Sequence, residues 1–366
     1  MVGALGRGGA ELQLMALADA MVRRGHEVEV LLYAEPSVLD DELRARGVVV
    51  HVIEARGRRA KVAATRAWFD AYQPEVVHGV MKRASSLALL ARLPRAAPAV
   101  IATDMSTATY GRRKPELWAS LLVFALANRV VTQTETNRAS LARLAPWLRA
   151  KTTVVRNGLD TQRFSPDPWW PRDTDDVFTF CVVGTVYAVK NPDRVVRAVA
   201  ELVRRGFDGF RVRWYGRLRA PNGYESDRHP AVNLAKQLGV DDRITFEGEV
   251  TDVERVYRDS DAILHASVQE GFPNVVAEAM ACGLPVVVSN VSDLPAIVRT
   301  ARNGVVFDPM SSSDIASAME WMLSVEACER QRMGQRSRAC AVDLFAMDRF
   351  ADDFEAVYRT AWSRGV

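Results

Sequence analysis

Two glutamates and the turn between them form the stretch of this chain best suited to chemistry. Residues 262–289 read AILHASVQEGFPNVVAEAMACGLPVVVS. Glu270 stands just before a turn at residues 272–274, and Glu278 follows roughly 7.5 Å along the axis of the helix that this turn is predicted to start. The first amides of a helix lack intrahelical partners and the helix dipole is positive there. The turn is therefore suited to hold a phosphate.

The two carboxylates flank this anion site. They cannot bind the anion themselves, but they can accept hydrogen bonds from hydroxyls on either side of it. A nucleoside diphosphate sugar has this order of groups: hydroxylated sugar, diphosphate, hydroxylated ribose. The alternative is an ordinary βαβ unit in which Glu270 and Glu278 are solvated charges, since helix starts are often acidic. Spacing alone leaves both interpretations open.

Short-range signals predict the elements that position these residues. Residues 262–266 form a short apolar run between polar residues, which predicts a buried strand. Gly271 frees the backbone, Pro273 suits the first turn of a helix, and Gly283 ends that helix. Residues 286–288 predict the next buried strand. The unit is strand, turn, helix, strand.

Lys190 is the candidate cation. It follows a strand predicted at residues 177–183 and stands directly before a helix start at Asn191 and Pro192. A lysine gains nothing from the dipole at a helix N-terminus, so an external anion is its natural counter-charge.

The amino-acid sequence of residues 262–289 also resembles that of a known family. EGFPNVVAEAMACGLPVV closely resembles the E-x7-E signature of retaining glycosyltransferases with the GT-B fold, family 4. The resemblance covers nearly the whole chain. It implies an α/β protein of two Rossmann-like, doubly wound domains facing an interdomain cleft. Residues 1–165 would bind the acceptor, residues 166–345 the donor, and a helix within residues 346–366 would cross back to the first domain.

The resemblance also implies roles for single residues. Glu270 and Lys190 are the candidate catalytic residues: Glu270 would orient the sugar hydroxyls and Lys190 would neutralise the diphosphate, while Glu278 would hold the ribose. The full donor-binding set is Gly184, Thr185, Lys190, Glu270, Gly271, Phe272, Pro273, Asn274, Val275 and Glu278. The family commonly has an arginine where this chain has Thr185, and Arg217 or Arg219 is either its replacement or a solvated charge.

The acceptor side is predicted from the first half of the chain. Its candidates are Gly8, Gly9, His78 and Asp104. The glycine-rich stretch at residues 3–11 leads into a helical pattern, and His78 and Asp104 lie near the ends of predicted strands, where α/β ligand crevices open. A solitary histidine is more often structural. Relatives have an apolar strand before the glycine-rich stretch, whereas only Met1 and Val2 precede it here, which predicts a truncated first strand.

Composition bounds the remaining possibilities. The chain has 366 residues, 48% apolar and 25% charged, which is typical of a globular protein with room for two domains. No apolar run approaches about 18 residues and no signal peptide is visible, so the cytoplasm is the expected compartment. Residues 1–165 carry 24 basic and 15 acidic residues, and the remainder carries 24 and 30. The basic first half favours an anionic partner there, with general arginine richness as the alternative.

Together with these observations, the resemblance implies a hexosyltransferase that moves a sugar with retention from a UDP- or GDP-sugar to a glycan or lipid-linked acceptor, in cell-surface polysaccharide or glycolipid synthesis. No cofactor, metal or nucleic acid is expected, and peripheral contact with the inner face of the membrane stays open. The alternatives are a nucleotide-sugar epimerase on the same fold and a catalytically silent nucleotide-sugar-binding subunit. Thr185 and the missing first strand favour the silent subunit.

Overall fold

A computed structural model describes residues 1–3, 9–33, 38–104, 115–167, 177–218 and 230–363. The chain packs as two compact units. The first combines Met1–Gly158 with Met347–Val366, and the second is Leu159–Ala346. The chain enters the second unit before the boundary expected from the sequence, because Leu159 and Phe164 are buried in the core of the second unit.

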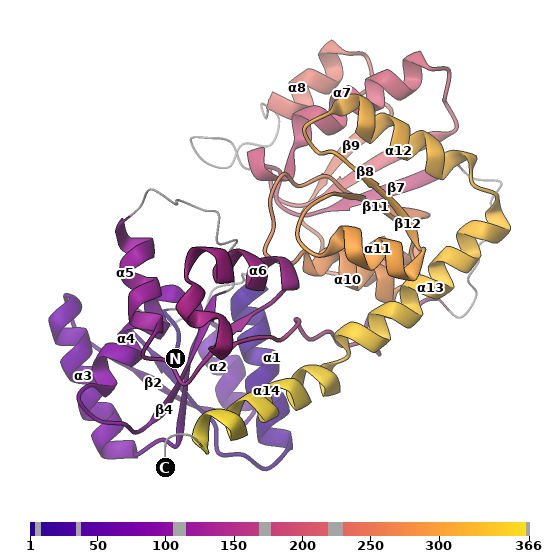
Figure 1. Cartoon of the computed structure of the whole chain (residues 1–366). Coiled ribbons are helices and arrows are strands. Elements are labelled where there is room, and N and C mark those ends of the chain that lie inside the picture. The colour runs from indigo at the N-terminus through magenta and orange to yellow at the C-terminus, as the bar shows by residue number, and fades with distance from the viewer. Residues whose placement is uncertain (4–8, 34–37, 105–114, 168–176, 219–229, 364–366) are drawn as a thin grey trace. The chain divides into compact units, whose positions relative to one another are not determined.

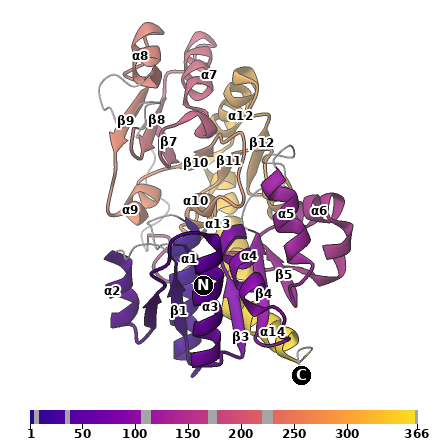
Figure 2. The same ribbon diagram turned by 90° about the vertical axis from the view of Figure 1, so that its left-hand side faces the viewer.

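The second unit is built on one parallel sheet of six strands. In chain order they are β7 (Phe178–Val183), β8 (Phe210–Tyr215), β9 (Ile244–Gly248), β10 (Ala262–His265), β11 (Val286–Ser289) and β12 (Gly304–Phe307). Across the sheet the order is β12-β11-β10-β7-β8-β9, and Figure 2 shows the strands side by side in this order. The central strands are buried on both faces, as is usual for a parallel sheet covered by helices.

The direction of strand order reverses beside β7. The chain runs from β7 outward through β8 to β9 and then returns, so that β10 pairs with the other side of β7. In open α/β sheets, ligands bind outside the carboxyl ends of the strands at such a switch point. The segments that follow β7 and β10 are therefore the expected location of a site.

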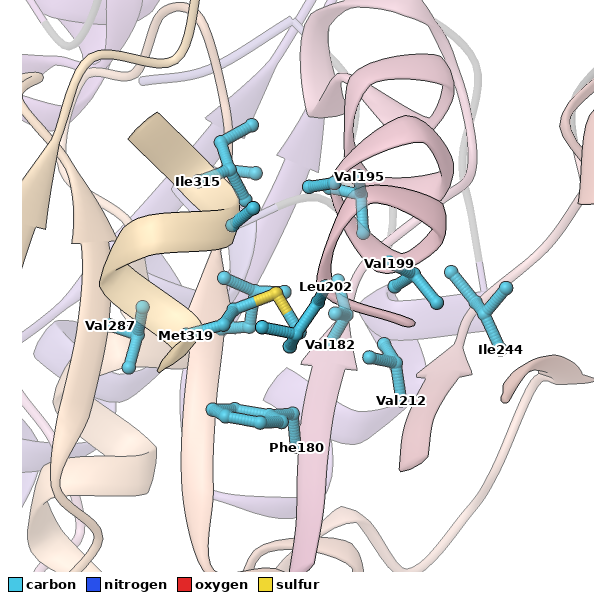
Figure 3. Close-up of a cluster of buried hydrophobic side chains, with 14 of the residues drawn as sticks. Phe180, Val182, Val195, Val199, Leu202, Val212, Ile244, Val287, Ile315 and Met319 are labelled. Carbon is cyan, nitrogen blue, oxygen red and sulfur yellow. The ribbon is translucent and has the colours of Figure 1, made fainter. Parts of the chain in front are cut away.

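Helices cover both faces of this sheet. They are α7 (Pro192–Arg204), α8 (Pro230–Gln237), α9 (Val253–Arg258), α10 (Asn274–Ala281), α11 (Leu294–Ala301), α12 (Ser312–Ser324) and α13 (Ala327–Phe345), with the 3-10 turn η2 (Ala188–Lys190). α7 and α12 lie side by side on one face (Figure 1), and Figure 3 shows their apolar side chains packed with Phe180 and Val287 of the sheet. Val286 and Val288 belong to the core on the opposite face, with α10 and α11. This alternation follows from the two-residue period of a strand.

The first unit contains two parallel sheets. One is β1 (Glu29–Leu32) with β2 (Val49–Val52); the other has the order β3 (Val76–Gly79), β4 (Ala99–Asp104), β5 (Arg129–Thr132), β6 (Thr152–Val154), of which β3, β4 and β5 are labelled in Figure 2. Met1 and Val2 connect the two sheets. The Val2 amide donates to the Leu31 carbonyl at 3.1 Å, and the Val80 amide donates to the Met1 carbonyl at 2.9 Å.

The first unit recruits its last helix from the far end of the chain. Its helices are α1 (Gly9–Arg23), α2 (Val38–Ala45), α3 (Arg58–Tyr72), α4 (Met81–Arg92), α5 (Pro115–Phe124), α6 (Glu135–Leu144) and α14 (Met347–Trp362), with the 3-10 turn η1 (Pro146–Lys151). α14 lies beside α1 (Figure 1), where Phe350, Phe354 and Val357 share a buried cluster with Leu17 and Met21. Within the described ranges, no helix has both the length and the apolar character needed to cross a membrane.

Candidate active site

Lys190 and Glu270 meet at the switch point of the second sheet. Lys190 ends the turn after β7, Glu270 follows β10, and Lys190 Nζ donates to Glu270 Oε1 at 2.6 Å. The two side chains are only 19% and 17% exposed. Burial would raise the pKa of Glu270, but His265 and the Lys190 ammonium outweigh it and lower the pKa to about 2. The carboxylate is therefore ionised at neutral pH.

Asn191 fixes the turn that carries Lys190. Its backbone is left-handed, with φ of 67°, and it separates η2 from α7. The buried side-chain amide donates to the carbonyls of Ala266 at 3.2 Å and Pro309 at 2.7 Å. A backbone hydrogen bond of 2.9 Å from Val268 to Val189 joins the same two segments. The lysine after β7 is thus fastened directly to the chain after β10.

The turn after Glu270 is held by contacts on both sides. The Ser292 hydroxyl donates to the Gly271 carbonyl at 2.5 Å, and Phe272 packs on Phe345 of α13 with ring centroids 5.0 Å apart. Pro273 takes the N-cap position of α10, and its side chain makes no capping hydrogen bond. The helix dipole makes this end positive. The residues predicted to hold the phosphate, 272–274, therefore lead into α10 directly after Glu270.

Glu278 lies on the second turn of α10 with its own partner. The Tyr257 hydroxyl, from α9, donates to Glu278 Oε2 at 2.7 Å. Burial raises the pKa of Glu278, although the Tyr257 hydrogen bond and the Arg163 charge act to lower it. Tyr257 is fully buried and its own pKa is raised by burial first and by Glu278 second. A carboxylate in this setting is a strong acceptor with one oxygen already oriented.

Gly184 and Thr185 lie in the loop between β7 and η2. The Gly184 amide donates to the Tyr215 carbonyl at 2.8 Å, and its carbonyl accepts from Trp214 Nε1 at 2.8 Å. A Cβ on Gly216 would lie 2.1 Å from the Gly184 oxygen, so only glycine permits this approach. Thr185 is half-buried.

Arg217 and Arg219 are the candidates to replace the arginine that the family commonly has at the position of Thr185. Arg217 forms an exposed ion pair with Glu249 and is half-exposed. Arg219 lies outside the described residues. Lys190 and the positive end of α10 are therefore two described positive groups at the switch point.

The acceptor-side candidates lie in the first unit. Both ring nitrogens of His78 have partners there: Nδ1 lies 3.0 Å from the Tyr358 hydroxyl and Nε2 lies 2.5 Å from Thr103 Oγ1. Burial lowers the pKa of His78 to about 3, with a smaller effect of the N-terminal charge. Asp104 is 3% exposed, 3.5 Å from Lys82 Nζ. Gly9 is exposed at the start of α1, and Gly8 lies outside the described residues. Contact of these residues with an acceptor stays a prediction.

Over the part of the chain that the structure describes, no three His, Cys, Asp or Glu side chains gather in the way a metal site requires. The expectation of a metal-independent site stays a prediction.

Several solved structures share this fold over nearly the whole chain. HepE of Anabaena, in a complex with UDP-glucose, superposes with a TM-score of 0.79 at 17% identity, covering 97% of this chain and 98% of HepE. The lipopolysaccharide outer core galactosyltransferase WaaB superposes with a TM-score of 0.76 at 15% identity, covering 98% and 99%. The mixed α/β architecture with parallel sheets is therefore the GT-B fold, as the sequence predicts.

Sequence similarity decides the family. Residues 7–163 match the model described as glycosyltransferase family 4, and residues 171–339 match the model described as glycosyl transferases group 1. The D-inositol 3-phosphate glycosyltransferase of Actinosynnema mirum is 31% identical over 347 aligned residues, with 85% of this chain and 83% of that protein covered. This chain belongs to the GT-B glycosyltransferases of family 4.

Two residues of this glycosyltransferase site, His265 and Tyr257, could not be identified from the sequence. His265 lies inside the predicted strand at residues 262–266, and its only signal is that it is the single polar residue of that run. Tyr257 precedes Glu278 by 21 residues and lies on another helix, so no spacing rule links the two. Both were identified only through the contacts that they make in the folded chain.

Proposed function

We propose that this glycosyltransferase transfers a hexosyl group, with retention at the anomeric carbon, from a nucleoside diphosphate sugar to a hydroxyl of a glycan or lipid-linked acceptor. The donor would bind at the carboxyl ends of β7 and β10. The diphosphate would lie between Lys190 and the start of α10, with the sugar toward Glu270 and the ribose toward Glu278.

One observation carries this proposal: the fold brings Lys190 to within 2.6 Å of Glu270 at the switch point, beside the positive end of α10. The lysine and the helix end are the groups needed to stabilise a diphosphate that gains charge as it leaves. Glu270 and Glu278 are acceptors suited to hydroxyls on either side of it. Lys190 and Glu270 are 80 residues apart in the sequence, so the fold itself makes this contact.

The proposed reaction balances without a covalent enzyme intermediate. The acceptor oxygen forms a bond to the anomeric carbon while the bond from that carbon to the diphosphate oxygen breaks. The leaving diphosphate takes the proton of the acceptor hydroxyl. Lys190 stabilises the charge that develops on the diphosphate, and Glu270 orients the sugar.

The names of similar proteins support the substrate classes. HepE was solved with UDP-glucose, which supports a nucleoside diphosphate sugar as donor. WaaB acts in the lipopolysaccharide outer core, which supports a surface glycan or its lipid-linked precursor as acceptor. The Actinosynnema relative is named for D-inositol 3-phosphate, so a small phosphorylated polyol is the second candidate acceptor.

The test is transfer from UDP- and GDP-hexoses to these two acceptor classes, with the anomeric configuration of the product read by NMR. We expect the configuration of the donor to be kept. Lys190→Ala should lower kcat/KM for the donor by about a hundredfold or more, the loss typical of removing one group that stabilises a developing anion. Lys236→Ala, at an exposed lysine on α8, is the matched control and should keep wild-type kinetics.

Other results of the transfer assay would identify a different function. Interconversion of the donor without an acceptor would identify an epimerase, and binding without turnover would identify a silent subunit. An inverted product would reject the retaining reaction. Wild-type donor kinetics in Lys190→Ala would reject the site.

A further inference from the structure

Binding of a donor would deprive Glu270 of its counter-charge. If the proposed function holds, the diphosphate draws Lys190 Nζ away from Glu270 Oε1, which it now contacts at 2.6 Å. Glu270 is only 17% exposed. A largely buried carboxylate that loses its cation is destabilised unless another donor reaches it. The geometry should therefore include a second donor to Glu270.

His265 has the position of such a donor. It is the last residue of β10, its side chain is 4% exposed, and its Nε2 lies 3.5 Å from the same Oε1 of Glu270. The 3.5 Å contact with Glu270 is long and does not have hydrogen-bond geometry, and within the described residues this Nε2 has no hydrogen bond to any other group. Buried side-chain nitrogens nearly always have one, so a nitrogen left unpaired beside a carboxylate requires an explanation.

Ser289 is the polar neighbour of the other ring nitrogen of His265. It ends β11, is fully buried, and its Oγ lies 3.5 Å from His265 Nδ1. A hydroxyl that donates to Nδ1 leaves the single proton of a neutral ring on Nε2, the atom that faces Glu270. Burial is the largest influence on His265 and lowers its pKa, which favours the neutral ring.

We propose that His265 is a positioning residue that holds the Glu270 carboxylate while Lys190 is engaged with the diphosphate of the donor. The inference rests on the proposed function. The Nε2–H group of His265 replaces the Nζ–H group of Lys190 as the donor to Glu270 Oε1, and no proton is transferred. Glu270 thereby stays ionised and keeps the orientation in which it accepts hydrogen bonds from the sugar. His265 itself touches neither substrate.

Two amide variants separate this role from simple packing. The side-chain nitrogen of glutamine reaches the position of Nε2, whereas that of asparagine reaches only the position of Nδ1. We expect His265→Gln to keep kcat/KM for the donor within a few-fold of wild type. His265→Asn should lower it by about ten- to a hundredfold, the range for losing a hydrogen bond to a charged group. The dissociation constant of the His265→Asn variant for UDP, or for GDP if that nucleotide binds better, should rise as well. In this variant Glu270 has no second donor, so Lys190 stays with Glu270 and is less available to the diphosphate.

Equal losses in both variants, or no loss in either, would overturn the role of His265. Should either variant unfold in a thermal scan, NMR of the wild-type protein with 15N-labelled histidine gives the second measurement. The Nε2–H proton of His265 should shift downfield when UDP or GDP saturates the site, because the hydrogen bond to Glu270 then forms. An unmoved resonance in the saturated protein would also overturn it.

The design distinguishes this inference from the proposed function. If the wild-type protein neither binds UDP and GDP nor transfers a sugar, the proposed function fails and this inference fails with it. If the wild-type protein transfers a sugar and Lys190→Ala is impaired while His265→Asn is not, only the role of His265 fails.

Discussion

Glu270 and Glu278 flank the same helix start, but their surroundings shift their pKa values in opposite directions. For Glu270 the effect of burial is outweighed by His265 and Lys190, and the pKa falls to about 2. For Glu278 burial dominates and the pKa rises, although Tyr257 opposes the shift. Glu270 is therefore fixed as an anion, and Glu278 is the carboxylate whose charge responds to pH.

Tyr257→Phe tests this difference at the residue scale. The substitution removes the hydroxyl that stabilises the Glu278 carboxylate, so the pKa of Glu278 should rise further. A group with a raised pKa loses its charge at a higher pH on acidification, so KM for the donor should begin to increase at a higher pH than in wild type. At neutral pH we expect about a tenfold increase in KM, as for the loss of a hydrogen bond to a charged group.

The measurement is KM for the donor against pH. Tyr72→Phe is the matched control, because the Tyr72 side chain is half-exposed on α3 in the first unit. Superposed profiles for Tyr257→Phe and wild type would show that Tyr257 does not act on Glu278.

At the scale of elements, one glycine lies just beyond each end of β8, and the two differ in the space available for a side chain. Gly216 follows the strand with φ of 152°, and a Cβ there would meet the Gly184 carbonyl at 2.1 Å. Gly209 precedes the strand and has open space around its missing Cβ. The close contact at the carboxyl end allows the loop of Gly184 and Thr185 to lie against the end of β8.

Gly216→Ala should therefore destabilise the second unit and disturb the loop beside the site. We expect a loss of about 2 kcal/mol or more in the free energy of unfolding, since both overpacking and an unfavourable backbone angle contribute. Gly209→Ala, at the other end of the same strand, should change stability by no more than about 0.5 kcal/mol. Denaturant unfolding of both variants checks this, and equal stabilities would show that the loop adapts without cost.

At the scale of the whole molecule, the two units are not consecutive pieces of sequence. The first unit is closed by α14, which the chain supplies after the second unit is complete. Phe354 of α14 packs against His78 with ring centroids 5.1 Å apart and is 5% exposed. The stability of the acceptor-side candidates therefore depends on the last helix of the chain.

Phe354→Ala should loosen the first unit selectively. Removing a buried phenylalanine costs about 3–5 kcal/mol because the lost contacts leave a cavity. Hydrogen exchange should quicken in β3 and β4 and stay unchanged in β7 and β10. Trp362→Ala, at a side chain 49% exposed on the same helix, is the control and should leave both units protected. Faster exchange throughout the chain would show instead that the two units unfold together.

The elements around the site could be predicted from local sequence because their signals are local. Predicted strand 262–266 is β10, predicted strand 286–288 lies within β11, and α10 begins directly after Pro273. Gly283 follows the C-terminal end of α10 with φ of 85°, a conformation that glycine adopts most readily. These outcomes depend on apolar period and on the backbone limits of glycine and proline, which act over a few residues.

The sequence by itself therefore determined the strand, turn and helix that carry Glu270 and Glu278, and it singled out Lys190. Only the tertiary structure decided that β10 pairs with β7, which brings Lys190 within 2.6 Å of a carboxylate 80 residues away. It also decided that Glu249 pairs with Arg217, that Tyr257 supports Glu278, and that His265 faces Glu270. The physical reason is that strand order and side-chain partners depend on contacts between distant segments, which form only when the sheet assembles.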